Sequence, residues 1–230
     1  MGFSRYAVGT APRVISGVER AALVRRTYGL VLVGVVVSLI GAAFTFTQAS
    51  LMNAVAAHPF ITAICWFAPL MMAQSQPRSY PRNVILTLLF TFIVGVWLAP
   101  MMLYYLRMQP GVLAEAGLLT FSTFGVLTLY AAFSRRDFSA WGGFFVTGLW
   151  VLVATMVVGF FVPSIGGSLW ISAIGVFIFS GLLVFDTWRI TRSGQFGEQD
   201  YVVAAVTIYL DLLNLFLFIL SLVSGGNRRN

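Results

Sequence analysis

The chain has 230 residues, of which 59% are hydrophobic and only 9% are charged. Soluble domains carry roughly a quarter charged residues, so this composition excludes an ordinary soluble protein and indicates one that crosses a membrane several times. The net charge is +7, but the arginines lie beside the ends of apolar segments, where topology and anionic lipid head groups account for them, and nucleic-acid binding is not expected.

Residues 1–26 come first and contain five arginines. The apolar segment that follows is too long for the core of a cleavable signal peptide, so we expect residues 1–26 to form a flexible cytoplasmic tail. Residues 27–224 are expected to form the membrane domain, and residues 225–230 a short C-terminal tail.

Apolar segments recur along the membrane domain at nearly even spacing. Each is close to the roughly 20 residues that a helix needs to cross a bilayer, and none alternates as a barrel strand would. The fold class predicted is therefore an all-α polytopic membrane protein with seven transmembrane helices. Their expected ranges are 28–47, 54–74, 84–106, 112–133, 142–163, 169–190 and 201–223.

Arginines predict the orientation of these helices. The loops after the first and fifth spans contain none, whereas the N-terminal tail and the loops after the second, fourth and sixth spans contain several. The positive-inside rule therefore places the N-terminus and these loops in the cytoplasm. Arg228 and Arg229 do not follow this rule, because seven full spans would put them outside the cytoplasm. Either the last segment crosses the membrane and these two arginines are an exception, or the segment is re-entrant and they lie inside.

Several classes of site are excluded by residue counts. Cys65 and His58 are the only cysteine and histidine, so a zinc or haem centre is not expected. The chain contains no lysine, which excludes a retinal Schiff base. We expect no tightly bound cofactor.

Two acidic residues stand out among seven. The other five lie in the tail, at loop edges or in loops, where solvated charges are ordinary: Glu19, Glu115, Asp137, Glu198 and Asp200. Asp186 lies near the end of the sixth span, where it could simply pair with Arg189 on the same helical face. Asp211 lies about ten residues inside the last span, roughly 15 Å along its axis, where an ionised carboxylate needs a partner, a proton or a function. Its structural alternative is a polar contact that fixes helix packing.

A stripe of small and polar residues includes Asp211. A four-three spacing places its members on one face of the last helix, and we expect that face to meet a polar cavity or a partner carboxylate. The stripe comprises Asp200, Ala204, Thr207, Asp211, Asn214, Phe218 and Ser221. Small residues that would permit close helix approach occur in the first span, at Gly34 and Ser38, and in the sixth, at Gly175 and Gly181.

The short loop "TRSGQFGEQD" makes the facing ends of the sixth and last spans neighbours. Asp186 and Asp211 would still differ in depth unless the last helix begins inside the cytoplasm or the sixth is tilted. Two carboxylates within a few Å cannot both ionise cheaply and tend to share a proton, which would make a pH-sensitive latch.

Several stretches of the sequence resemble those of a known family. "LYAAFSRRDFSAWGGFF" (129–145), "ISAIGVFIFSGLLVFDTWRI" (171–190) and "YLDLLNLFLFIL" (209–220) are similar to stretches of the Bax inhibitor/YccA family, the transmembrane Bax inhibitor motif proteins, in its bacterial branch. "RTYGLVLVGVVVSLIGA" in the first span and "TFIVGVWLAPMM" in the third agree with it, and the resemblance covers nearly the whole chain after the tail.

The resemblance implies two layers of three helices around a central C-terminal helix. It also implies a pH-sensitive calcium leak, with Asp186 and Asp211 as the gate and as transient calcium ligands; Arg189, Thr207, Asn214, Arg78 and Arg82 are candidate supporting residues. Some members carry a basic partner within the second span, but residues 54–74 contain no arginine here.

Two other functions are alternatives to a calcium leak. An intramembrane aspartyl protease also uses two aspartates, but it would need a Gly-x-Gly-Asp stretch, and "IYL" precedes Asp211; we therefore expect no enzyme. The stronger alternative is a regulator of membrane-protein quality control that binds a membrane-bound ATP-dependent protease, since bacterial relatives are linked to that role. The resemblance favours the bacterial inner membrane, with lipid and calcium ions as partners.

Overall fold

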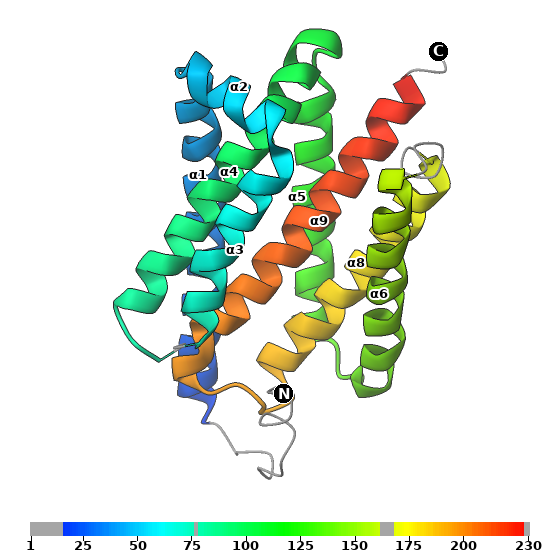
Figure 1. Ribbon diagram of the computed structural model, residues 1–230. Helices are drawn as coiled ribbons and strands as arrows, with labels where there is room; N and C mark the ends of the chain where they lie inside the picture. Colours follow the sequence, from blue (N-terminus) through cyan, green and yellow to red (C-terminus); the bar gives the residue numbers. More distant parts are fainter. Residues whose placement is uncertain (1–15, 76–77, 162–167, 228–230) are drawn as a thin grey trace.

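The computed structural model describes residues 16–75, 78–161 and 168–227, and the described regular structure is helical. Its elements are α1 (Gly17–Phe46), α2 (Ala49–Ala57), α3 (Pro59–Ser75), α4 (Arg82–Met108), α5 (Val112–Phe133), α6 (Ser139–Phe161), α8 (Leu169–Thr191), the short 3₁₀ helix η1 (Glu198–Asp200) and α9 (Tyr201–Asn227). Figure 1 shows the long helices standing side by side as a bundle.

Five of the described helices are long and apolar enough to cross a membrane: α1, α4, α5, α8 and α9. The bent pair of α2 and α3 would make a sixth, and the apolar stretch Ser139–Thr155 of α6 is shorter. The prediction of an all-helical membrane protein is therefore confirmed. The count of seven spans stays a prediction.

The second expected span is broken. Residues 54–74 were expected to form one helix, but α2 and α3 meet at His58 and Pro59 with a bend of 98°. Proline has no N–H to donate to the preceding turn, and its ring disfavours helical backbone at the residue before it. His58 accordingly leaves the helical region, with φ −130° and ψ 58°.

The first helix starts earlier than the expected span. α1 begins at Gly17, and Ser16 caps it: the Ser16 hydroxyl accepts from the Glu19 amide while the Glu19 side chain accepts from the Ser16 amide. This reciprocal capping box satisfies two donors of the first turn. Part of the segment expected as a tail, including Arg20, Arg25 and Arg26, is therefore helical.

α9 is the most buried of the candidate spans, with 61% of its apolar window inside the protein against 17–44% for the others. It packs against α8, α5, α1 and α4. The position expected for the C-terminal helix, surrounded by other helices, agrees with this burial. The arrangement of the remaining helices in two layers of three stays a prediction.

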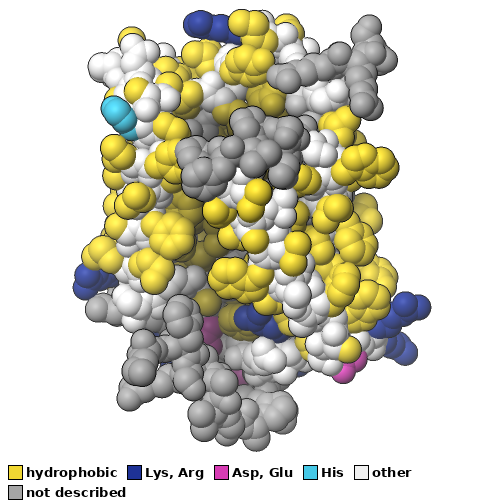
Figure 2. All heavy atoms as spheres, turned by 45° about the vertical axis from the view of Figure 1, so that its right-hand side comes forward, with side chains coloured by type: hydrophobic (Ala, Val, Ile, Leu, Met, Phe, Trp, Pro, Cys, Tyr) yellow, Lys and Arg dark blue, Asp and Glu magenta, His cyan; other side chains and the backbone are white. Residues whose placement is uncertain are grey.

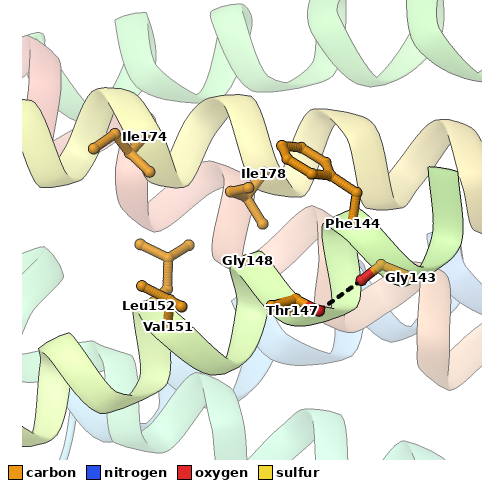
Figure 3. Close-up of a pocket in the computed structure, with 8 residues that line it drawn as sticks. All are labelled: Gly143, Phe144, Thr147, Gly148, Val151, Leu152, Ile174 and Ile178. Atoms are coloured by element: carbon orange, nitrogen blue, oxygen red, sulfur yellow. Dashed lines mark hydrogen bonds between the residues drawn. The ribbon is translucent and has the colours of Figure 1, made fainter.

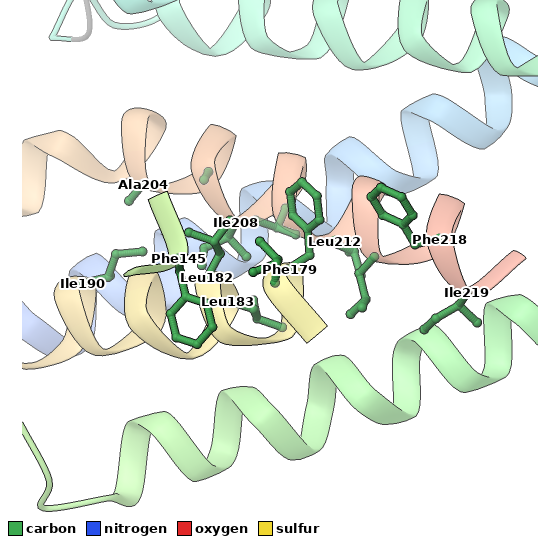
Figure 4. Close-up of a cluster of buried hydrophobic side chains, with 14 of the residues drawn as sticks. Phe145, Phe179, Leu182, Leu183, Ile190, Ala204, Ile208, Leu212, Phe218 and Ile219 are labelled. Atoms are coloured by element: carbon green, nitrogen blue, oxygen red, sulfur yellow. The ribbon is translucent and has the colours of Figure 1, made fainter. Parts of the chain in front are cut away.

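The main apolar core lies where α9 meets α8, and Figure 4 shows side chains of both helices meeting there. Small residues allow the close approach. A Cβ on Gly175 would collide with the Phe218 ring, one on Gly181 with the Phe145 ring, and one on Gly34 would lie 3.1 Å from Thr91 Cγ2. The prediction that these glycines permit close helix contacts is confirmed. A smaller cluster joins α3 and α4 to α9 around Phe90 and Tyr209.

The ends of the bundle differ in charge. We call the end at which α1, α4 and α9 begin and α5 and α8 finish the basic end. It carries Arg20, Arg25, Arg26, Arg78, Arg82, Arg135, Arg136, Arg189 and Arg192, whereas Arg107 lies at the opposite end of α4. Figure 2 shows yellow apolar side chains over the middle of the molecule, with blue and magenta side chains gathered mostly towards its lower end.

α9 runs without interruption from the basic end to the opposite end (Figure 1). Its 27 residues span about 40 Å at the rise of an α-helix, enough to cross a bilayer. Of the two alternatives for the last segment, this continuous helix favours the one that crosses, and the crossing itself stays a prediction. Arg228 and Arg229 lie outside the described residues.

Candidate functional site

Asp186 and Asp211 lie inside the bundle, on facing helices. Asp186 is in the last third of α8 and Asp211 in the first half of α9, and their side chains are 6% and 5% exposed. Their carboxyl groups lie close enough to interact electrostatically with each other. The difference in depth that the sequence suggested is absent because α8 and α9 are inclined side by side (Figure 1).

Arg189 neutralises one of the two carboxyl groups. Its Nη1 donates to Asp186 Oδ1 at 2.9 Å, one helical turn along α8. The rings of Phe185 and Phe196 lie 5.8 Å and 5.0 Å from the guanidinium, so aromatic faces hold the cation in place. The local pair considered as the structural explanation of Asp186 is therefore present, but it leaves Asp211 without a cation of its own.

Asp211 is the less satisfied of the two carboxyl groups. Its Oδ2 is buried and makes no hydrogen bond to any group in the described part of the chain. A hydrogen bond between two carboxyl groups requires that one of them carry a proton, because an ionised carboxylate only accepts. This arrangement can therefore bind and release a proton between α8 and α9.

Tyr28 and Thr187 complete the surroundings of the pair and were missed from the sequence. The hydroxyl groups of Tyr28, on α1, and Thr187, next to Asp186, lie 2.9 Å apart in a hydrogen bond. Tyr28 also interacts electrostatically with both aspartates. A tyrosine near the start of an apolar segment is ordinary in a membrane interface, so no sequence signal distinguished it.

The candidate supporting residues do not gather around the aspartates. Thr207 and Asn214 each bond a carbonyl four residues back in α9, those of Val203 and Leu210, at 3.0 Å and 2.7 Å. Arg78 binds Asp200 at 3.1 Å. Arg82 is the first residue of α4. Arg189, in contrast, binds Asp186 of the pair directly.

Three members of the stripe predicted on the last helix, Asp211, Phe218 and Ser221, contact residues of α8. Towards the C-terminus of α9, about two turns after Asp211, Phe218 stacks on Phe179 of α8 with ring centroids 5.7 Å apart. Further on, Ser221 and Ser172 share a hydrogen bond of 2.7 Å between their hydroxyl groups. The partner carboxylate that the stripe was expected to meet is Asp186.

The described residues contain no cluster of three or more histidine, cysteine, aspartate or glutamate side chains that could hold a metal ion. Two carboxylates and a hydroxyl can nevertheless supply hard oxygen donors of the kind calcium prefers. Any calcium contact at Asp186 and Asp211 would therefore be incomplete without water.

An open apolar pocket of about 440 Å³ lies elsewhere, between α6 and α8. Figure 3 shows Ile174 and Ile178 of α8 opposite Val151 and Leu152 of α6. Its one polar side chain, Thr147, donates to the Gly143 carbonyl at 2.8 Å. With its polar group bonded internally, this pocket offers no ligand to an ion.

Comparison with known proteins gives a match over most of the chain. The family described as "Inhibitor of apoptosis-promoting Bax1" matches residues 20–229. "Bax inhibitor 1" of Schizosaccharomyces pombe is 30% identical over 209 residues, covering 89% of this chain and 76% of that protein. An "uncharacterized membrane protein" of Vibrio cholerae is 30% identical over 217 residues, covering 92% and 93%. "Protein lifeguard 4" of Mus musculus is 25% identical over 213 residues, covering 91% and 87%.

Proposed function

The chain belongs to the family "Inhibitor of apoptosis-promoting Bax1", and from this membership we propose that it is a pH-sensitive calcium leak gated by Asp186 and Asp211. The protein would act as a conduit and not as an enzyme. The observation that carries the proposal is the contact of two buried carboxyl groups between α8 and α9 with one cation, Arg189, for both.

Proton binding would set the state of this contact. With one proton on the pair and Arg189 beside Asp186, the pair and the cation are together neutral, so α8 and α9 stay in contact. At higher pH the proton leaves, and two negative charges face each other with one positive charge beside them. Because repulsion in a poorly solvated site is strong, the basic ends of α8 and α9 separate and admit water.

Calcium would pass while the two helices are apart. The ionised carboxylates attract a divalent cation and supply oxygen ligands, and the small number of ligands keeps the ion's residence short. The loop between α8 and α9 can accommodate the movement, because Gly194 has a positive φ of 72° that side chains rarely adopt. Gly194 and Gly197 are the pivots that we propose.

Flux measurements test the gate directly. We expect purified wild-type protein in liposomes to conduct calcium more strongly as the pH rises from about 5 to 8. Asp211→Asn and Asp186→Asn should each abolish most of this pH dependence, because a neutral amide neither loses a proton nor gains a charge. Asp137→Asn is the matched control: its Oδ1 accepts from the Ser139 amide in a loop at the basic end, and asparagine preserves that bond.

Retention of the full pH dependence in Asp211→Asn would falsify the gate. The absence of flux above empty liposomes would instead favour a second function, a regulator that binds other membrane proteins. The relatives named "Bax inhibitor 1" and "Protein lifeguard 4" favour such a role, in which the α8–α9 contact switches a binding surface. A membrane-bound ATP-dependent protease is the partner we propose for a bacterial protein.

A further inference from the structure

A basic recess lies at the basic end of the bundle, away from the aspartates. It has a volume of about 610 Å³ and is formed by the first turns of α1, the end of α5 and the end of α8. Its lining residues are Gly17, Arg20, Ala21, Val24, Arg25, Ala132, Thr191 and Arg192. Small side chains at four of these positions leave the space between the three helices open.

Three arginines and no acidic residue line this recess. Arg192 is held in place, because its Nη2 donates to the Ala132 carbonyl at 2.9 Å, and the remaining N–H groups of the guanidinium stay available. The exposed side chains of Arg20 and Arg25 make no hydrogen bond or ion pair with the described residues. The recess therefore presents converging donors and an uncompensated positive charge.

Other arginines at this end already have carboxylate partners. Arg26 binds Glu198 and Arg78 binds Asp200, each at 3.1 Å. The arginines of the recess differ from them, since α1 and the end of α8, far apart in the sequence, bring cations without a carboxylate partner to one recess. The positive-inside rule explains why arginines lie on one side of a membrane, but it does not require that they converge.

We propose that this recess binds the phosphate-bearing headgroup of an anionic membrane lipid. Guanidinium groups match phosphate oxygens with paired N–H donors, and basic hollows between helices at a membrane surface suit such headgroups. Exposed apolar residues follow two of the lining residues in the sequence: Val18, after Gly17, and Phe133, after Ala132, are 81% and 78% exposed. A lipid fits better than a soluble phosphate ester, because its glycerol and acyl chains would cover this apolar surface.

Native mass spectrometry of the full-length protein tests the proposal by counting bound lipids. Phosphatidylglycerol and phosphatidylcholine are titrated separately onto the detergent-solubilised protein. We expect the wild type to bind one phosphatidylglycerol more tightly than phosphatidylcholine. The combined variant Arg20→Gln, Arg25→Gln, Arg192→Gln should weaken that first binding step at least about tenfold, since it removes all three guanidinium groups that line the recess.

A matched variant removes the same charge outside the recess. Arg107→Gln, Arg135→Gln and Arg136→Gln together should change the first binding step less than about twofold. The double variant Arg20→Gln, Arg25→Gln keeps Arg192 and its bond to Ala132, so it tests the site if the triple variant does not fold; we expect a loss of about fivefold or more.

Three outcomes would overturn the proposal. Equal weakening in the matched variant would mean diffuse attraction to positive charge, and unchanged binding in the double and triple variants would mean that the recess is not the site. Displacement of phosphatidylglycerol by an equal concentration of soluble glycerol 3-phosphate would mean that the recess takes a free phosphate ester and not a lipid. None of these readouts depends on calcium flux, so this test is independent of the proposed gate.

Discussion

At the scale of single residues, Arg189 determines how easily the aspartate pair carries a negative charge. Without it, two buried carboxyl groups would be neutral over a wide pH range, because a second unpaired charge in this site costs several kcal/mol. With its bond of 2.9 Å to Asp186, one carboxyl group can be ionised while the other exchanges a proton. The first negative charge on the pair is thus stabilised by Arg189, whereas a second negative charge is not.

The first prediction at this scale concerns Arg189→Gln. Removing the cation makes the charged state of the pair less favourable, so deprotonation needs a higher pH. We expect the pH midpoint of calcium flux to move upward by about one unit or more. The midpoint is read from flux into liposomes at a series of pH values.

Two variants control this experiment. Arg189→Lys keeps a positive charge within reach of Asp186 and should restore most of the original midpoint, whereas Arg136→Gln removes an exposed arginine at the same end and should leave the midpoint unchanged. An identical shift in Arg136→Gln would show that surface charge, and not the Asp186 contact, sets the pH response.

At the scale of helices, α1 and α4 pack almost backbone to backbone. A Cβ on Gly95 of α4 would collide with the Ser38 carbonyl oxygen and lie 2.9 Å from Ser38 Cα. Ser38 is fixed there in turn, since its hydroxyl bonds the Thr91 carbonyl at 2.9 Å and shares a hydrogen bond of 2.7 Å with Tyr209. Close backbone approach and inter-helix hydrogen bonds are what hold helices together where lipid removes the hydrophobic driving force.

Gly95→Ala therefore should destabilise the protein. The new methyl group meets backbone, which cannot turn aside as a flexible side chain can, so we expect a loss of about 1–3 kcal/mol in the free energy of unfolding. Thermal unfolding of the purified protein in detergent measures the change. Gly125→Ala, on α5 with nothing within 4 Å of the added Cβ, should leave stability equal or slightly higher. Similar losses in both variants would mean that the α1–α4 contact is not the cause of the loss, since alanine is the better helix former at both positions.

At the scale of the whole molecule, the uneven distribution of arginine predicts how the bundle sits in a membrane. The basic end carries most of the described arginines, and α9 reaches the opposite end. From the positive-inside rule we predict that the basic end faces the cytoplasm. The basic recess would then face the cytoplasmic leaflet, where anionic lipids give a negative surface potential.

Labelling with a membrane-impermeant maleimide checks this orientation. Cys65 is exposed, so it is first replaced by serine. Gln195→Cys, in the exposed loop before η1, should then react only in inside-out vesicles. Gln48→Cys, exposed between α1 and α2, should react only in right-side-out vesicles. The reverse pattern would invert the predicted topology and place the recess on the outer leaflet.

The sequence by itself determined the class of protein and several of its helices. A membrane-spanning helix satisfies its backbone hydrogen bonds within its own segment, so its length and apolar composition are local properties that one stretch of sequence carries. The expected range 112–133 coincides with α5, and Asp211 was identified because an acid inside such a stretch has a cost that needs an explanation. Gly34, Gly175 and Gly181 were recognised as contact points for the same local reason.

Only the tertiary structure decided which groups meet. Whether Asp186 and Asp211 lie at one depth depends on the inclination of α8 and α9, which follows from how side chains of facing helices interlock. The same packing brings Tyr28 to Thr187 and gathers Arg20 and Arg25 of α1 and Arg192 at the end of α8 into one recess, while it leaves Thr207, Asn214 and Arg78 bonded elsewhere. The spacing of residues along one helix carries no information about the rotation, tilt and depth of its neighbour, so these contacts appear only when all the helices are packed together.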